Sequence, residues 1–144
     1  MKSRYQLLSG AIRILFALLP TQAFAAELTV SLEDIRTTEG KLMIAILDSE
    51  AAFNGEHPAV ASLRLPASGD TITFSIDSLP PGRYGVQVMH DVNNNSDLDS
   101  NLVDMPIEPW GFSNNATGNF GPPVWADVSF ELTQTSHQTI QLNH

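Results

Sequence analysis

The chain has 144 residues, of which seven are basic and sixteen acidic, so its formal net charge is −9. This length favours one domain, and the acidic balance argues against nucleic-acid binding because a phosphate backbone requires a basic patch. There is no cysteine, which excludes disulfides, thiol catalysis and thiolate metal sites.

Residues 1–25 have the three parts of a secretory signal peptide. A positive start is followed by an apolar run and by the small-x-small cleavage motif Ala23-Phe24-Ala25. We expect cleavage between Ala25 and Ala26 and a single mature domain, residues 26–144, that is periplasmic or secreted from a bacterium. The alternative is an uncleaved anchor, although the apolar run is short for a membrane span.

Cleavage would make the chain more acidic. It would remove three of the seven basic residues and leave four against sixteen acidic ones, a formal net charge of −12. Such a charge favours solubility, a cationic partner or bound cations. We expect no nucleic-acid partner and no membrane span after cleavage, and a protein, peptide or glycan partner is left open.

Alternation of apolar and polar residues predicts a series of short strands. Residues 28–33 alternate strictly, whereas residues 41–47 are apolar on both faces, as in a central strand covered on both sides. One helical turn is expected within residues 48–55. The remaining predicted strands are residues 61–65, 71–76, 83–90, 128–132 and a final strand around Ile140 and Leu142.

These seven short strands, without a helix of three turns, predict an all-β fold. The spacing of the turns favours a seven-stranded antiparallel β-sandwich of immunoglobulin-like character, with a small barrel as the alternative. Residues 91–126 lack strand periodicity. A loop that long in a compact domain is usually functional or disordered. Because it contains four large aromatic residues, we expect it to be ordered and to fold over a sheet face or edge.

Oxygen-bearing side chains alternate at the start of this loop: Asp91, Asn93, Asn95, Asp97 and Asp99. Calcium takes six to eight oxygen ligands, which such a loop can bring together. The opening fits the first part of a helix-flanked calcium loop, but Ser96 replaces its Gly, Leu102 replaces its Glu, and the preceding element is a strand. We therefore predict a weak calcium site closed by Asp99 or Asp104, and the alternative is a cluster of Asx turns without metal.

Signals for catalysis are few. His90 ends a core strand, where a histidine is more often a structural group than a ligand or a base, and the other histidines lack the spacing of a zinc site. The common hydrolase and nucleotide-binding motifs do not occur. We predict no catalytic residue, and a metal-assisted hydrolase using His90 and Asp91 is the least favoured alternative.

Residues 108–123 mix aromatic residues with Gly, Pro and Asn. Exposed aromatic side chains beside amides can stack on a sugar or hold a peptide. The candidate ligand-binding residues are Trp110, Phe112, Asn114 and Asn115. The alternative is a satellite core beneath the loop, made of Trp110, Phe112, Phe120 and Trp125. The exposure of Trp110 separates the two interpretations.

Several motifs occur in order along the mature chain. They are Leu79-Pro80-Pro81-Gly82-x-Tyr84, then His90-Asp91-x-Asn93-x-Asn95 with Asp99, then Glu108-Pro109-x-Gly111-Phe112-Ser113-Asn114-Asn115, and finally Gly121-Pro122-Pro123. In this combination the chain resembles the exported bacterial family known as domain of unknown function 2141. The resemblance implies export and a β-sandwich of the transthyretin-like or carboxypeptidase-regulatory-like type, but no activity. Family members often carry Gly at the position of Ser96.

Together these residues predict an exported, non-enzymatic β-sandwich module. Calcium, bound by the Asp91–Asp99 loop, is the one cofactor that we expect. The alternative function is that of a carbohydrate- or peptide-binding accessory domain that uses Trp110 and Phe112.

Overall fold

The structure is a computed structural model that describes residues 25–144. The expected signal peptide, apart from Ala25, lies outside the described residues. The first strand begins at Ala26, which follows the predicted cleavage site. Within residues 25–144, no helix is both long enough and apolar enough to cross a membrane.

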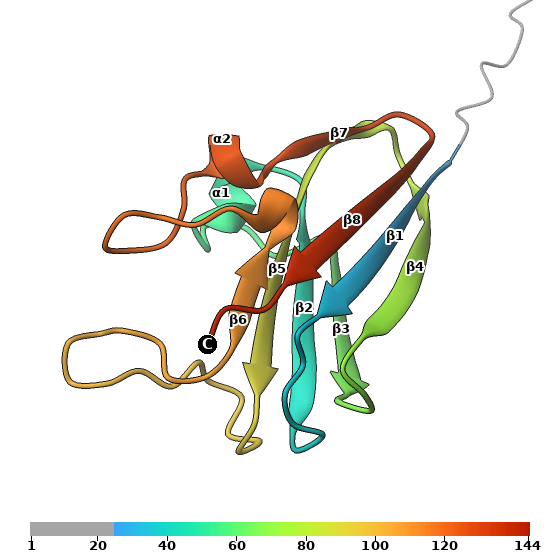
Figure 1. Cartoon of the computed structure of the whole chain (residues 1–144). Helices are drawn as coiled ribbons and strands as arrows, with labels where there is room; N and C mark the ends of the chain where they lie inside the picture. Colours follow the sequence, from blue (N-terminus) through green and yellow to red (C-terminus); the bar gives the residue numbers. More distant parts are fainter. Residues whose placement is uncertain (1–24) are drawn as a thin grey trace, which may run out of the picture.

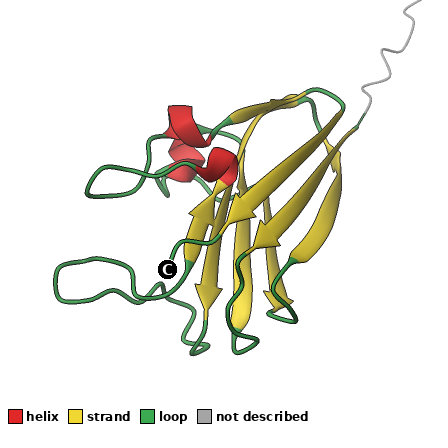
Figure 2. Ribbon diagram, viewed as in Figure 1, coloured by secondary structure: helices red, strands yellow, loops and turns green. Residues whose placement is uncertain are grey.

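The described chain forms eight strands and three short helical turns, and the helical turns gather at one end of the strands (red in Figure 2). In chain order the elements are β1 (Ala26–Glu33), β2 (Lys41–Leu47), α1 (Glu50–Phe53), β3 (Ala61–Pro66), β4 (Ile72–Leu79), β5 (Gly82–Asp91), β6 (Trp110–Phe112), η1 (Ser113–Asn115), α2 (Trp125–Val128), β7 (Phe130–Leu132) and β8 (Thr135–Gln141) (Figure 1).

The strands form two sheets. One has the order β4-β1-β8, and the other has the order β3-β2-β5-β6, with β7 paired to the first residues of β5. The predicted all-β, two-sheet architecture is thus confirmed, and the barrel alternative is wrong because the strands divide between two sheets.

Two details of the predicted sandwich are wrong. There are eight strands in the described chain, since β6 forms within the segment that was expected to contain none. The sheets are also not wholly antiparallel, because β1 runs parallel to β8, with Val30 opposite Gln138. Two neighbouring parallel strands require a long connection between them. Here most of the domain, from β2 to β7, lies in the connection between β1 and β8.

The C-terminal strands differ from their predicted ranges. Val128 ends α2 and does not start a strand, so that β7 is limited to three residues. β8 begins at Thr135, in a stretch that resembles a polar turn. Its half-buried positions Ser136 and Gln138 precede a single buried apolar residue, Ile140, which leaves too little apolar alternation to detect from sequence.

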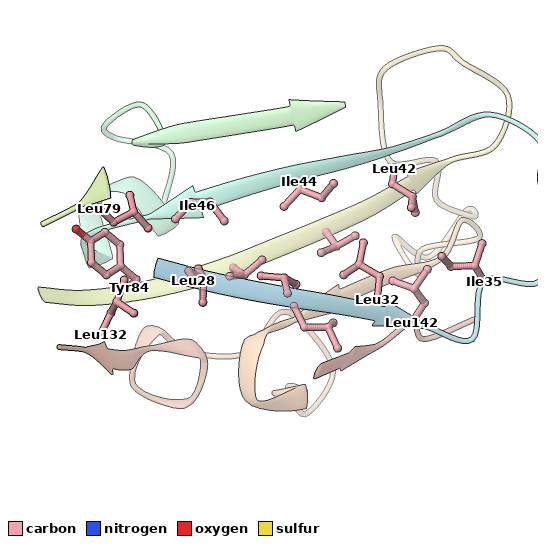
Figure 3. Close-up of a cluster of buried hydrophobic side chains, with 14 of the residues drawn as sticks. Leu28, Leu32, Ile35, Leu42, Ile44, Ile46, Leu79, Tyr84, Leu132 and Leu142 are labelled. Carbon is pink, nitrogen blue, oxygen red and sulfur yellow. The ribbon is translucent and has the colours of Figure 1, made fainter. Parts of the chain in front are cut away.

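The core lies between the two sheets (Figure 3). Its fully buried members come from alternate positions of the strands: Leu28, Val30 and Leu32 of β1, Leu42 and Ile46 of β2, Val86 of β5, Leu132 of β7 and Ile140 of β8. Burial of each such side chain contributes about 1.5–3 kcal/mol. The alternation in residues 28–33 therefore predicted the inward face correctly.

Candidate functional site

The Asp91–Asp99 loop follows β5 and is organised by the Asp91 carboxylate. This side chain is completely buried. Its Oδ1 accepts the N–H of Asn95 at 3.0 Å, and its Oδ2 accepts the N–H of Ser96 at 2.9 Å. Asp91 thus folds the first five residues of the loop back onto the end of the strand.

A lysine compensates the charge of Asp91. Lys41 begins β2 directly opposite Asp91, and its Nζ lies 3.0 Å from Asp91 Oδ2. Lys41 also donates a hydrogen bond of 3.3 Å to Ser96 Oγ. Burial opposes ionisation of Asp91, but Lys41 and the two loop N–H groups together outweigh it, and they lower the pKa of Asp91 below its ordinary value of 3.8.

The exposed half of the loop is a run of Asx turns. Asn93 Oδ1 accepts the N–H of Asn95 at 3.0 Å, and Asn95 Oδ1 accepts the N–H of Asp97 at 2.9 Å. The side-chain amides of Asn93 and Asn95 both donate to the carboxylate of Asp99. Most polar groups of the loop are therefore paired with one another.

Glu108 holds both ends of the loop, a role that sequence reasoning missed. Its Oε1 accepts the N–H of Val92 at 2.9 Å, and its Oε2 accepts the N–H of Asp99 at 3.1 Å. The side chain is buried. Glu108 lies sixteen residues beyond Val92, so no local spacing pattern could have connected them.

Asp91 stands apart from the other four predicted calcium ligands. Asp91 fits a cation poorly because the Lys41 ammonium already lies beside it. Among residues 25–144, no three His, Asp or Glu side chains gather as a metal group. A calcium ion on this loop would be held by the remaining four residues, of which the first three are exposed and the last is half-buried: Asn93, Asn95, Asp97 and Asp99.

His90 is a structural residue in this fold. The residue is completely buried, and its Nε2 lies 2.8 Å from the carbonyl oxygen of Glu39. Its backbone N–H donates to the carbonyl oxygen of Pro109. Its Nδ1 is buried without a hydrogen-bond partner. A substrate cannot reach this imidazole without local unfolding, which weakens the basis of the hydrolase alternative.

Trp110 and Phe112 lie on the outer face of the β3-β2-β5-β6 sheet. Between them, Gly111 faces inward, because a Cβ there would lie 2.7 Å from Ile140 of the other sheet. Phe112 is buried in a second apolar cluster that also contains Val128. Trp110 is half-buried, with its ring centroid 5.7 Å from that of Phe112.

The satellite-core interpretation is correct for most of the aromatic residues and wrong for one. The ring of Phe53, from α1, packs 5.9 Å from Phe112 and 6.0 Å from Trp125. Phe120 is fully exposed, with a relative accessibility of 105%. The half-buried position of Trp110 leaves part of its ring accessible beside the sheet face.

Asn114 and Asn115 are committed to backbone contacts. Both adopt positive φ, a conformation that asparagine tolerates. The Asn114 amide donates to the carbonyl oxygens of Asp127, Val128 and Ser129 at 2.9–3.2 Å. Asn115 bonds Thr139 and Gln141 of β8. These contacts attach η1 to α2 and β8, and they bring neither amide into an open site.

A groove lies on the outer face of the sheet, over β3, β2 and β5. Its volume is about 640 Å³, and its lining includes Met43, Arg64, Gln87 and Met89. This face of β2 was expected to be covered, because residues 41–47 are apolar on both sides. The expectation is wrong because α1 and α2 lie at one end of the sheet and leave the middle open (Figure 1).

The long segment between β5 and α2 forms two projecting loops. Residues 98–107 and 117–124 extend toward the same side of the sandwich, at the left of Figure 1, instead of folding over a sheet as expected. Seven of the eight large hydrophobic side chains exposed in the described chain lie between residues 98 and 124. The exposed apolar side chains of the described chain are thus concentrated in these two loops.

Comparison with known proteins gives one match. A family model described as an uncharacterized protein conserved in bacteria (DUF2141) matches residues 30–141, which is most of the chain. No curated protein and no solved structure matches.

Proposed function

The chain belongs to the uncharacterised bacterial family DUF2141, and we propose that it is an exported, non-enzymatic β-sandwich module that presents the loops between β5 and α2. One observation carries the proposal. His90 and Asp91, the pair best suited to chemistry, are buried and used in structural contacts, whereas the residues after them display apolar side chains to solvent.

We further propose that calcium is a weak ligand of the exposed half of the Asp91–Asp99 loop. The amides of Asn93 and Asn95 are followed there by two carboxylates, Asp97 and Asp99, with one residue between each. In extracellular modules such loops bind calcium with dissociation constants of about 10⁻⁴–10⁻³ M. The Lys41–Asp91 ion pair supports the base of the loop without the metal, so calcium would add stability to a loop that is already folded.

Thermal unfolding of the mature chain in calcium, magnesium or chelator tests this proposal. Calcium at one hundred times its dissociation constant should add about 2.7 kcal/mol to the free energy of unfolding. The Asp97→Asn/Asp99→Asn variant should lose this response, whereas the control Asp70→Asn, in the exposed turn before β4, should retain it. Melting curves that are identical in millimolar calcium and in chelator would contradict calcium binding.

The accessible part of Trp110 favours a second candidate function, carbohydrate or peptide binding on the outer sheet face. Trp110 lies opposite Met89 of the groove. In a Trp125→Phe variant, Trp110 is the single tryptophan, so its fluorescence should change saturably with oligosaccharides or peptides that bind there. A spectrum that stays constant across a broad panel of both would count against this function.

A further inference from the structure

The hairpin tip between Ser100 and Pro106 exposes three large apolar side chains, those of Leu102, Val103 and Met105. Leu102 has a relative accessibility of 105%, and Val103 of 74%. The tip is shaped by Asn101, whose Oδ1 accepts the N–H groups of Val103 and Met105 at 3.0 and 3.2 Å. These apolar side chains are therefore held outward by an ordered turn, and they are not packed against the rest of the molecule.

The tip also carries one negative charge. Asp104 stands between Val103 and Met105 at a φ of 57°, and its N–H donates to the carbonyl oxygen of Asn101 at 3.0 Å. Its side chain is exposed. The tip therefore presents a carboxylate flanked by aliphatic groups, and a matching site needs an apolar floor beside a cation.

The groove on the outer sheet face has these properties. Met43 of β2 pairs across the strands with Met89 of β5, and Met89 pairs with Trp110 of β6. On its other side, Met43 pairs with Arg64 of β3. The register thus places the Arg64 side chain of β3 at one end of an apolar row that crosses β2, β5 and β6.

Arg64 is the basic residue whose side chain has the fewest hydrogen bonds and ion pairs among residues 25–144. Of the four basic side chains among residues 25–144, Arg36 pairs with Asp34, Lys41 pairs with Asp91, and Arg83 donates to Ser129. The Arg64 side chain makes neither a hydrogen bond nor an ion pair with any described residue. In this acidic chain, the groove thus combines the unpaired positive charge of Arg64 with the apolar side chains of Met43 and Met89.

We propose that the occupant of the groove is the hairpin tip of a second copy of this chain. Leu102 and Val103 would cover the Met43–Met89 floor, and the Asp104 carboxylate would meet the Arg64 guanidinium, a pairing that favours two parallel hydrogen bonds. Arg64 lies on β3, at the opposite edge of the sheet from β6, beyond which the hairpin projects (Figure 1). Tip and groove therefore face different neighbours, and the contact is heterologous, which generates a ring or an open chain.

Sedimentation velocity of the mature chain, from micromolar to millimolar concentration, tests the proposal. The sedimentation coefficient should rise with concentration. Arg64→Glu and Asp104→Arg should each reduce the association constant by about tenfold or more, because each places like charges in contact. Asp77→Arg, an exposed change on β4 of the other sheet, is the matched control and should associate like the wild type.

Mixing the two charge-reversed variants gives the decisive result. In an equimolar mixture each tip meets a groove of opposite charge on the other variant, so association should return. A wild-type chain that stays monomeric at millimolar concentration would overturn the proposal. So would association that persists in both variants, or a mixture that remains monomeric. Should either variant fail to fold, Arg64→Gln and Asp104→Asn measure the same contact. Neither Arg64 nor Asp104 is among the four residues proposed to hold calcium, so a negative calcium result leaves this test intact.

Discussion

The buried Asp91 carboxylate makes the free energy of unfolding depend on pH. Its pKa is lowered in the folded chain, so folding favours the ionised form and the contribution of Asp91 to stability is complete well above its ordinary pKa. That contribution is lost as the pH falls through 3.8 toward the lower folded value. The free energy of unfolding should therefore fall steeply in this acidic range.

Replacement of Lys41 separates this effect from those of the other carboxylates. Lys41→Met leaves the buried Asp91 charge without its counterion, so the variant should be less stable at pH 7 and should lose less stability on acidification. Denaturant unfolding across a pH series measures both quantities. Arg36→Met, which removes the solvent-exposed partner of Asp34, should change stability far less, and equal effects of the two changes would contradict the assigned role of Lys41.

Gly40 fixes how closely the β1–β2 turn approaches the acidic loop. Its φ is +71°, and a Cβ at this position would lie 2.0 Å from the carbonyl oxygen of Asp91 and 2.6 Å from Val92 Cα. Positive φ alone costs a residue with a side chain about 1–2 kcal/mol. Gly40→Ala should cost clearly more, because backbone atoms must also move.

Gly55 provides the control for Gly40. Its φ is +77°, but a Cβ there would meet no atom within 4 Å. Gly55→Ala should therefore show the conformational cost alone. Thermal unfolding compares the two variants, and equal losses of melting temperature would mean that the turn can move away from Asp91 at little cost.

At the scale of elements, the strands that bury a full apolar stripe could be predicted from sequence. The inward positions of β1 and β2 follow a period of two, and the structure buries them as expected. β6 could not be found this way because it is three residues long and its inward residue is Gly111. Its pairing depends on the fit of Gly111 against Ile140, a contact that local periodicity does not contain.

The candidate site was predictable only where its contacts are local. The Asx turns join residues two apart, and the Asp/Asn spacing indicates them directly. The Lys41–Asp91 pair depends on the register of β2 against β5, and the Glu108 contacts depend on the return of the chain into β6. Neither the β2–β5 register nor the return of the chain into β6 can be read from one sequence. The role of Lys41 as counterion and the role of Glu108 as a buried carboxylate were therefore both missed.

At the scale of the whole molecule, the packed core and the loops with exposed apolar side chains lie in different parts of the fold. The two sheets enclose one apolar core, while the loops that carry exposed hydrophobic residues leave the sandwich on one side (Figure 1). The alternation of apolar and polar residues predicted the all-β class but not this display, because exposed and buried leucines are alike until the chain is folded. Leu102 and Leu132 illustrate the difference, the first fully exposed and the second fully buried.

The parallel pairing of β1 with β8 also sets the order in which the protein can be completed. β1 is the middle strand of its sheet, so the pairing along one of its edges depends on β8, which is made after every other described strand. During synthesis β1 can pair with β4 alone, and its other edge stays open until Thr135–Gln141 emerges. Contacts this distant in sequence form slowly. The three-stranded sheet is therefore complete only when β8 is in place, so the β1–β8 pairing is expected to be a late step of folding.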